Sequence, residues 1–128
     1  MRHVRAAASL CTLWVLVLSA CGGRSPASPS TPEGATVTIT SAGVAPSALT
    51  VAPGTRVLFV NNDGRAHDMT SDPHPDHQDC PELNAVGLLQ PGQRRESGNL
   101  VMVRTCGFHD HDDPPPRGVR WTWRITVR

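Results

Sequence analysis

The last eight residues read Trp121-Thr122-Trp123-Arg124-Ile125-Thr126-Val127-Arg128, and apolar and polar side chains alternate along the whole stretch. Successive side chains of a β-strand point to opposite faces of its sheet, so this period of two predicts a strand with one buried and one solvated face. The side chains expected in the core are Trp121, Trp123, Ile125 and Val127. Because the alternation is unbroken, this stretch favours a sheet protein.

Working outward, other short segments repeat this strand pattern between turn signals. The segments are Thr36-Val37-Thr38-Ile39-Thr40, Leu49-Thr50-Val51, Arg56-Val57-Leu58-Phe59-Val60 and residues 99–105. Pro-Gly pairs at 53–54 and 91–92 mark turns, and no sustained helical period follows residue 35. Short strands spaced by turns are typical of sandwiches and barrels. The sequence therefore predicts one all-β domain, a small Greek-key β-sandwich, over residues 35–128.

The first 20 residues have the pattern of a targeting segment. Arg2 and Arg5 precede an apolar run over residues 6–18, which is too short to span a bilayer comfortably. The run ends in Leu18-Ser19-Ala20-Cys21, which resembles the lipobox of bacterial lipoproteins. That resemblance implies that Cys21 is acylated and holds the chain on a membrane of the cell envelope, facing the periplasm or the exterior. The alternative is an ordinary secretory signal that leaves Cys21 as a free thiol.

Residues 21–34 are rich in Gly, Ser and Pro and offer nothing to build a core. This composition is typical of a flexible linker, extended where proline is dense. We therefore expect a lipidated cysteine followed by a flexible linker ahead of the folded domain.

Composition argues against several classes of function. All 12 basic residues are arginines, balanced by 11 acidic residues, and no basic patch is interleaved with aromatics. Nucleic-acid binding is therefore not expected. The sequence also shows no nucleophile–base pair, phosphate loop or paired carboxylates of the kind that enzymes use. We expect a protein without catalytic activity.

Histidine and cysteine are concentrated in one part of the chain. Five of the 6 histidines lie between residues 67 and 111, together with Cys80 and Cys106. The sequence predicts two loops there, residues 61–80 after one strand and residues 106–116 after another. Imidazole and thiolate bind copper and zinc well. Because strand ends gather at the poles of a sandwich, these loops predict a metal site at one pole.

Two segments of the chain carry a family pattern. The first is Val51-Ala-Pro-Gly-Thr-Arg-Val-Leu-Phe-Val-Asn-Asn-Asp followed by His67, and the second is Cys106-Gly-Phe-His109. Together they resemble the cupredoxins, the plastocyanin and azurin family. The resemblance covers essentially the whole domain. It implies a cupredoxin-type sandwich with copper as cofactor, zinc being the second choice. It also implies electron transfer to a redox partner protein or a role in copper handling.

The roles carried over by this resemblance make His67, Cys106 and His109 the copper ligands, and His111 is an additional candidate. Three such ligands with a weak axial ligand form a blue-copper site. The sequence departs from the family at the axial methionine, because Asp112 stands at the nearest position and no methionine follows Met102. A backbone carbonyl, Asp112 or His111 is expected instead. His74 and His77 stand among Pro, Asp and Ser, and we interpret them as solvated loop residues.

Cys80 leaves two alternatives open. A Cys80–Cys106 disulfide would close a loop of about 25 residues and contribute about 3 kcal/mol of stability. It would also remove the thiolate of a blue site and leave a metal-free structural or partner-binding module. Alternatively, both thiols act as ligands with His67 and His109, a set better suited to Zn²⁺ or Cu(I).

Overall fold

The structure is a computed structural model that describes residues 35–114 and 121–128. The predicted targeting segment, the linker and Cys21 lie outside the described residues. Within the part of the chain that is described, no helix is long and apolar enough to cross a membrane.

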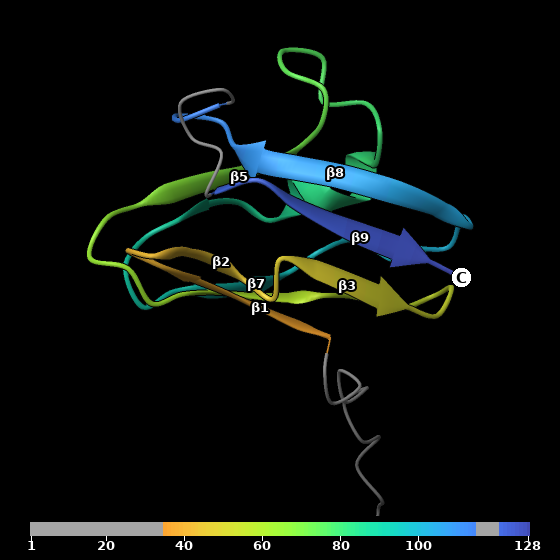
Figure 1. Ribbon diagram of the computed structural model, residues 1–128, viewed down its shortest axis with the longest axis horizontal. Coiled ribbons are helices and arrows are strands. Elements are labelled where there is room, and N and C mark those ends of the chain that lie inside the picture. Colours follow the sequence, from red (N-terminus) through yellow and green to blue (C-terminus); the bar gives the residue numbers. More distant parts are fainter. Residues whose placement is uncertain (1–34, 115–120) are drawn as a thin grey trace, which may run out of the picture.

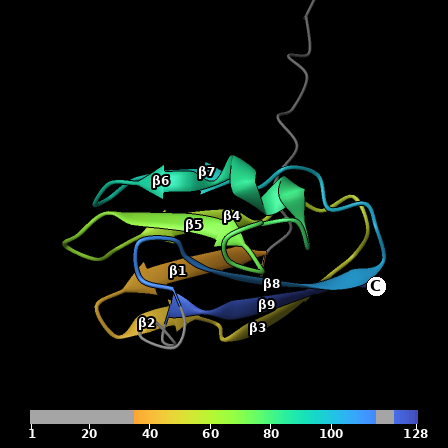
Figure 2. The ribbon, with the colours of Figure 1, turned by 90° about the horizontal axis from the view of Figure 1, so that it is seen from above.

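The described residues form two β-sheets packed face to face (Figures 1 and 2). One sheet has the strand order β2 (Gly43–Ala45), β1 (Thr36–Thr40), β4 (Leu58–Asn61), β7 (Arg94–Glu96). The other has the order β3 (Ala48–Val51), β9 (Trp123–Val127), β8 (Arg104–Asp110), β5 (His67–Ser71), β6 (Gly87–Leu89). A short 3₁₀-helix, η1 (Pro81–Ala85), lies between β5 and β6 in the chain.

Two strand pairings in the sandwich are parallel, and the others are antiparallel. Strand β1 runs parallel to β4, and β3 runs parallel to β9. Strand β8 is central to the second sheet, because it pairs with β9 on one side and with β5 on the other. The sequence-based prediction of an all-β sandwich is confirmed.

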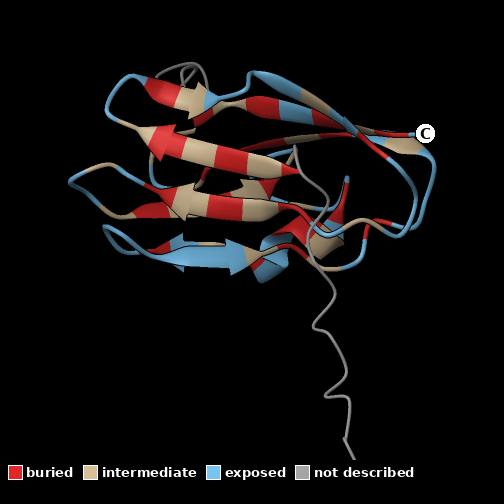
Figure 3. Ribbon diagram, turned by 90° about the horizontal axis from the view of Figure 1, so that it is seen from below, coloured by how far each residue is buried: buried red, intermediate tan, exposed pale blue. Residues whose placement is uncertain are grey.

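The core lies between the sheets and follows the alternation of the strands, as the banding in Figure 3 shows. The four apolar side chains predicted to be internal near the C-terminus are all buried, and three of them lie in β9 while Trp121 precedes it. Phe59, Phe108 and Trp123 pack edge to face, with ring centroids 4.8–6.1 Å apart. Aromatic rings in this arrangement gain stabilisation beyond their buried area.

Strand β8 differs most from the sequence-based expectation. The segment Cys106-Gly107-Phe108-His109 was expected in a loop after a strand at residues 99–105, but it lies within β8. Cys106 is paired with Ile125 of β9, and His109 with Thr70 of β5. Hydrogen bonding to a neighbour on each side therefore keeps this segment extended beyond the predicted strand end.

The extended conformation sorts the side chains of β8 between two faces. Cys106 and Phe108 point into the core, whereas Gly107 and His109 belong to the outer face. The loop of residues 72–80 rises over this outer face in Figure 1 and approaches Gly107 through Asp72. The outer face of β8 is thus a covered surface rather than a solvated one.

We predict that Phe59→Ala lowers the free energy of unfolding by about 3–5 kcal/mol, since it leaves a cavity between two aromatic rings. Leu88→Ala is the matched control, because Leu88 is 46% exposed and its truncation opens no cavity. Urea denaturation measures both variants. Equal losses would contradict this description of the core.

Candidate metal centre

Cys80 and Cys106 are joined in a disulfide with a Cα–Cα distance of 5.7 Å. Both residues are fully buried. The predicted role of Cys106 as a copper ligand is therefore wrong, because a disulfide sulfur has no thiolate to offer. The alternative ligand set, both thiols together with His67 and His109, is wrong for the same reason. Of the alternatives for Cys80, the structure contains the disulfide.

His67 does not join the other histidines either. It is the first residue of β5, and its ring is buried between two carboxylates. Nδ1 lies 2.8 Å from Asp110 Oδ2, and Nε2 lies 2.9 Å from Asp63 Oδ2. Both ring nitrogens are engaged, so neither is free for a metal. His67 is a structural residue here, which corrects its assignment as a copper ligand.

An ionic network surrounds His67 at this end of the sandwich. The guanidinium of Arg65 lies 3.6–3.7 Å from the carboxylates of Asp63, Asp110 and Asp113, and it stacks 4.8 Å from the ring centroid of Trp121. The hydrogen bond with His67 is the main cause that lowers the pKa of Asp63. Ion-paired side chains therefore surround His67 at the end of the sandwich where the sequence predicted a copper site.

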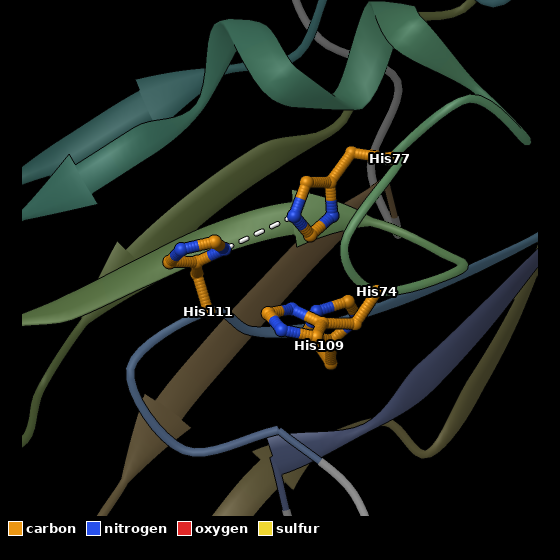
Figure 4. A group of neighbouring side chains, drawn as sticks. All are labelled: His74, His77, His109 and His111. Atoms are coloured by element: carbon orange, nitrogen blue, oxygen red, sulfur yellow. Dashed lines mark hydrogen bonds between the residues drawn. The ribbon is translucent and has the colours of Figure 1, made fainter.

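Four other histidines converge on the outer face of the second sheet (Figure 4). His74 and His77 come from the loop of residues 72–80, His109 from β8 and His111 from just beyond it. One ring nitrogen from each lies within 4.8 Å of the others. We call these residues the four-histidine cluster. His109 and His111 are predicted ligands that the structure brings together, whereas His74 and His77 were interpreted as solvated residues, and that interpretation missed their place in the cluster.

The ring of His109 is held so that one nitrogen is left for a ligand. Nδ1 lies 2.5 Å from Asp72 Oδ1. An ionised carboxylate only accepts hydrogen bonds, so Nδ1 carries the hydrogen and Nε2 of the neutral ring has a lone pair. This Nε2 is buried and has no hydrogen-bond partner among the described residues. A metal ion would satisfy it.

His77 is oriented in a similar way. Its Nδ1 donates to the carbonyl of Ser71 at 2.7 Å, which leaves the lone pair of the neutral ring on Nε2. That Nε2 lies 3.0 Å from Nδ1 of His111, and Figure 4 draws this contact as a dashed line. Imidazoles fixed by a carbonyl or carboxylate on the outer nitrogen are the usual form of metal-ligating histidine. The residues of the cluster therefore fit a transition-metal ion.

His74 lies on the exposed side of the cluster. Its ring centroid is 5.2 Å from that of His111 and 5.4 Å from that of His77. Loss of hydration, followed by repulsion from the neighbouring imidazoles, lowers the pKa of His74. Because the neutral ring is the form that binds metals, this shift favours ligation.

The sequence did contain a signal for His74 and His77. They lie in a short loop that ends at Cys80, and a Cys80–Cys106 disulfide draws this loop against the strand of His109. The disulfide and a metal site are therefore compatible, because the disulfide brings the two histidine pairs into the same region.

No family model matches this sequence, and no curated protein matches it either. Solved structures do match. A purple cupredoxin from Nitrosopumilus maritimus superposes with a TM-score of 0.53 at 16% identity, covering 73% of this chain and 98% of the other. Oxidised plastocyanin from Dryopteris crassirhizoma gives 0.51 at 20% identity, covering 73% and 99%. An oxidised amicyanin variant gives 0.56 at 15% identity, covering 73% and 80%.

The fold is that of a cupredoxin. Within this cupredoxin fold, the predicted ligands are divided between two places. His109 and His111 lie in the four-histidine cluster, while His67 and Cys106 are committed to an ionic network and a disulfide. Of the side chains considered as a fourth ligand, His111 belongs to the cluster and Asp112 does not.

The lowered pKa of His74 predicts how the stability of the metal-free protein depends on pH. The unfolded chain, with a His pKa of about 6.5, takes up the proton before the folded protein does. The free energy of unfolding should therefore fall as the pH drops below that value and continue to fall until the lower folded pKa is passed.

Urea unfolding of the wild type and of His74→Gln between about pH 5 and pH 8 measures this effect, because removing the group removes its share of the slope. His74→Gln should show the shallower decline. An unchanged slope would contradict the shift.

Proposed function

We propose that this protein is a lipid-anchored copper-binding protein of a bacterial cell envelope. The four-histidine cluster would hold Cu(II) and hand it on, without catalysing a reaction. One observation carries the proposal: His77 and His109 are both hydrogen-bonded through Nδ1, which leaves the lone pair of each neutral ring on Nε2 within a cluster of four imidazoles. Such fixed tautomers are characteristic of sites prepared for a metal.

The donor set favours Cu(II) among the available metals. Imidazole suits copper, zinc, nickel and iron, and Cu²⁺ binds most tightly among the divalent ions of the first transition row. Cu(I) prefers thiolate and thioether ligands. The cluster contains neither, since its four members are all histidines. Zinc is the second choice for the same site.

Copper handling fits these residues better than blue-copper electron transfer. A blue site needs a thiolate, and both cysteines of the described domain are in the disulfide. The exposure of His74 gives solvent access to one side of the cluster, so a partner protein could exchange copper there. The domain itself would act as a binding protein.

The envelope location rests on the sequence. Cys21 would carry the acyl chains, and residues 21–34 would form the flexible linker between the membrane and β1. A flexible linker of this length has a root-mean-square end-to-end distance of about 20 Å. The partners would be the membrane, reached through the lipid, and a protein that exchanges copper.

A metal-free module is the second candidate, and the disulfide favours it. The Cys80–Cys106 disulfide stabilises the folded domain by about 3 kcal/mol without any metal. The domain would then serve as a structural or partner-binding unit. Copper binding by the intact disulfide form separates the two functions.

We predict that the purified, oxidised protein binds Cu(II) through its imidazoles and shows no intense thiolate-to-copper absorption. His77→Ala and His109→Ala should each weaken Cu(II) binding by more than the roughly 10- to 100-fold typical for loss of an outer hydrogen-bond partner. Gln78→Ala is the matched control, because Gln78 is an exposed residue of the same loop. Its affinity should equal that of the wild type.

Isothermal titration against a competing chelator measures the affinities, and a thiol assay checks that the disulfide is intact. A wild type that retains no Cu(II) would support the metal-free module. An intense visible band that disappears in Cys106→Ser would restore the blue-copper assignment instead.

A further inference from the structure

Asp72 joins the loop of residues 72–80 to the strand that carries His109. Its backbone N–H donates to the carbonyl of Gly107 at 2.9 Å, and its own carbonyl accepts from the N–H of Asp79 at 2.8 Å. Its carboxylate reaches along β8 to Nδ1 of His109 at 2.5 Å. Asp72 is thus fixed at both its backbone and its side chain.

Gly107 provides the space that this carboxylate occupies. A Cβ atom at position 107 would lie 2.9 Å from Cγ of Asp72 and closer still to Oδ2. Real Cβ atoms essentially never come this near to another heavy atom. The glycine therefore leaves a notch in the outer face of β8, and the carboxylate lies in that notch beside the ring of His109.

We propose that Asp72, seated over Gly107, is the positioning residue of the metal site. It fixes His109 as the Nδ1–H tautomer and presents Nε2 to the metal. This inference rests on the proposed function, because it specifies how the same four-histidine cluster holds its ion. Gly107 takes part by keeping the notch open.

The chemistry follows from the contact. A carboxylate on the outer nitrogen selects the tautomer, limits ring rotation and makes the inner nitrogen a stronger donor. His109 is fully buried, so its ring cannot take this orientation from water. His77 obtains its orientation from the uncharged carbonyl of Ser71. Among the described residues, Asp72 is the one carboxylate within ion-pair distance of a ring nitrogen of the cluster, and its negative charge favours a divalent cation.

The first test needs no metal. Long-range ¹H–¹⁵N correlation spectra of the histidine side chains, recorded on the full chain, report which nitrogen carries the hydrogen. His109 should appear as a single Nδ1–H tautomer in the wild type and as a mixture in Asp72→Ala. Asp76→Ala is the matched control, since Asp76 is an exposed acidic residue of the same loop. A wild-type spectrum in Asp72→Ala would overturn the proposal.

The second test uses Cu(II) as the probe. Asp72→Ala should weaken Cu(II) binding about 10- to 100-fold, as is typical when an outer partner of a ligating histidine is lost. Pulsed EPR should count one imidazole fewer, or a changed coupling from one imidazole, in the bound form. Asp76→Ala should match the wild type in both measurements, and a loss of equal size there would overturn the proposal.

Gly107→Ala provides a second route to the same contact, because the added methyl displaces the carboxylate and leaves Asp72 in the sequence. It should weaken Cu(II) binding as Asp72→Ala does. The double variant should lose no more than either single variant, since both changes remove one interaction. Additive losses would overturn the link between the two residues. Circular dichroism confirms that each variant is folded.

Failure of this proposal can be told apart from failure of copper binding. If the wild type binds no Cu(II) but Asp72→Ala still changes the tautomer of His109, the positioning contact stands and the proposed function fails. If Cu(II) binds to the wild type and to Asp72→Ala equally, the function stands and the positioning role is overturned.

Discussion

The alternation of side chains along β8 determines which chemistry this domain can support. Cys106 and His109 are separated by three positions, and an odd separation in an extended strand places two side chains on opposite faces. The sulfur therefore lies in the core, and the imidazole lies outside the sheet. A loop has no such restriction, so the two side chains could converge there. Pairing of β8 with both neighbouring strands removes that freedom and rules out a shared copper ion.

The disulfide and the four-histidine cluster are two parts of one arrangement. The Cys80–Cys106 bond fastens the end of the loop of residues 72–80 through the interior, and Asp72 fastens its beginning on the outer face. Between these two points lie His74 and His77. The loop has little apolar surface with which to hold itself in place, so a covalent tie and a hydrogen-bonded carboxylate replace a hydrophobic anchor.

The sequence was a good guide to the fold and a partial guide to the site. Alternation in Thr36–Thr40 and Trp123–Val127 predicted two strands and the buried side chains of the last one, because a half-buried strand must repeat every two residues. The end of β8 was placed too early, since Gly107 and the polar residues after it resemble a loop when cross-strand partners are unknown. His67 was misassigned because nothing local shows that Asp63 and Asp110, the latter 43 positions away, close around its ring.

The Cys80–Cys106 disulfide also makes the position of this loop depend on redox conditions. Disulfides persist where the surroundings are oxidising and are rare where thiols are kept reduced. A chain with both thiols reduced would have its two histidine pairs on a strand and a loop that no covalent bond connects. Oxidation of Cys80 and Cys106 would therefore hold His74 and His77 beside His109, so the redox state of the surroundings would govern assembly of the four-histidine cluster.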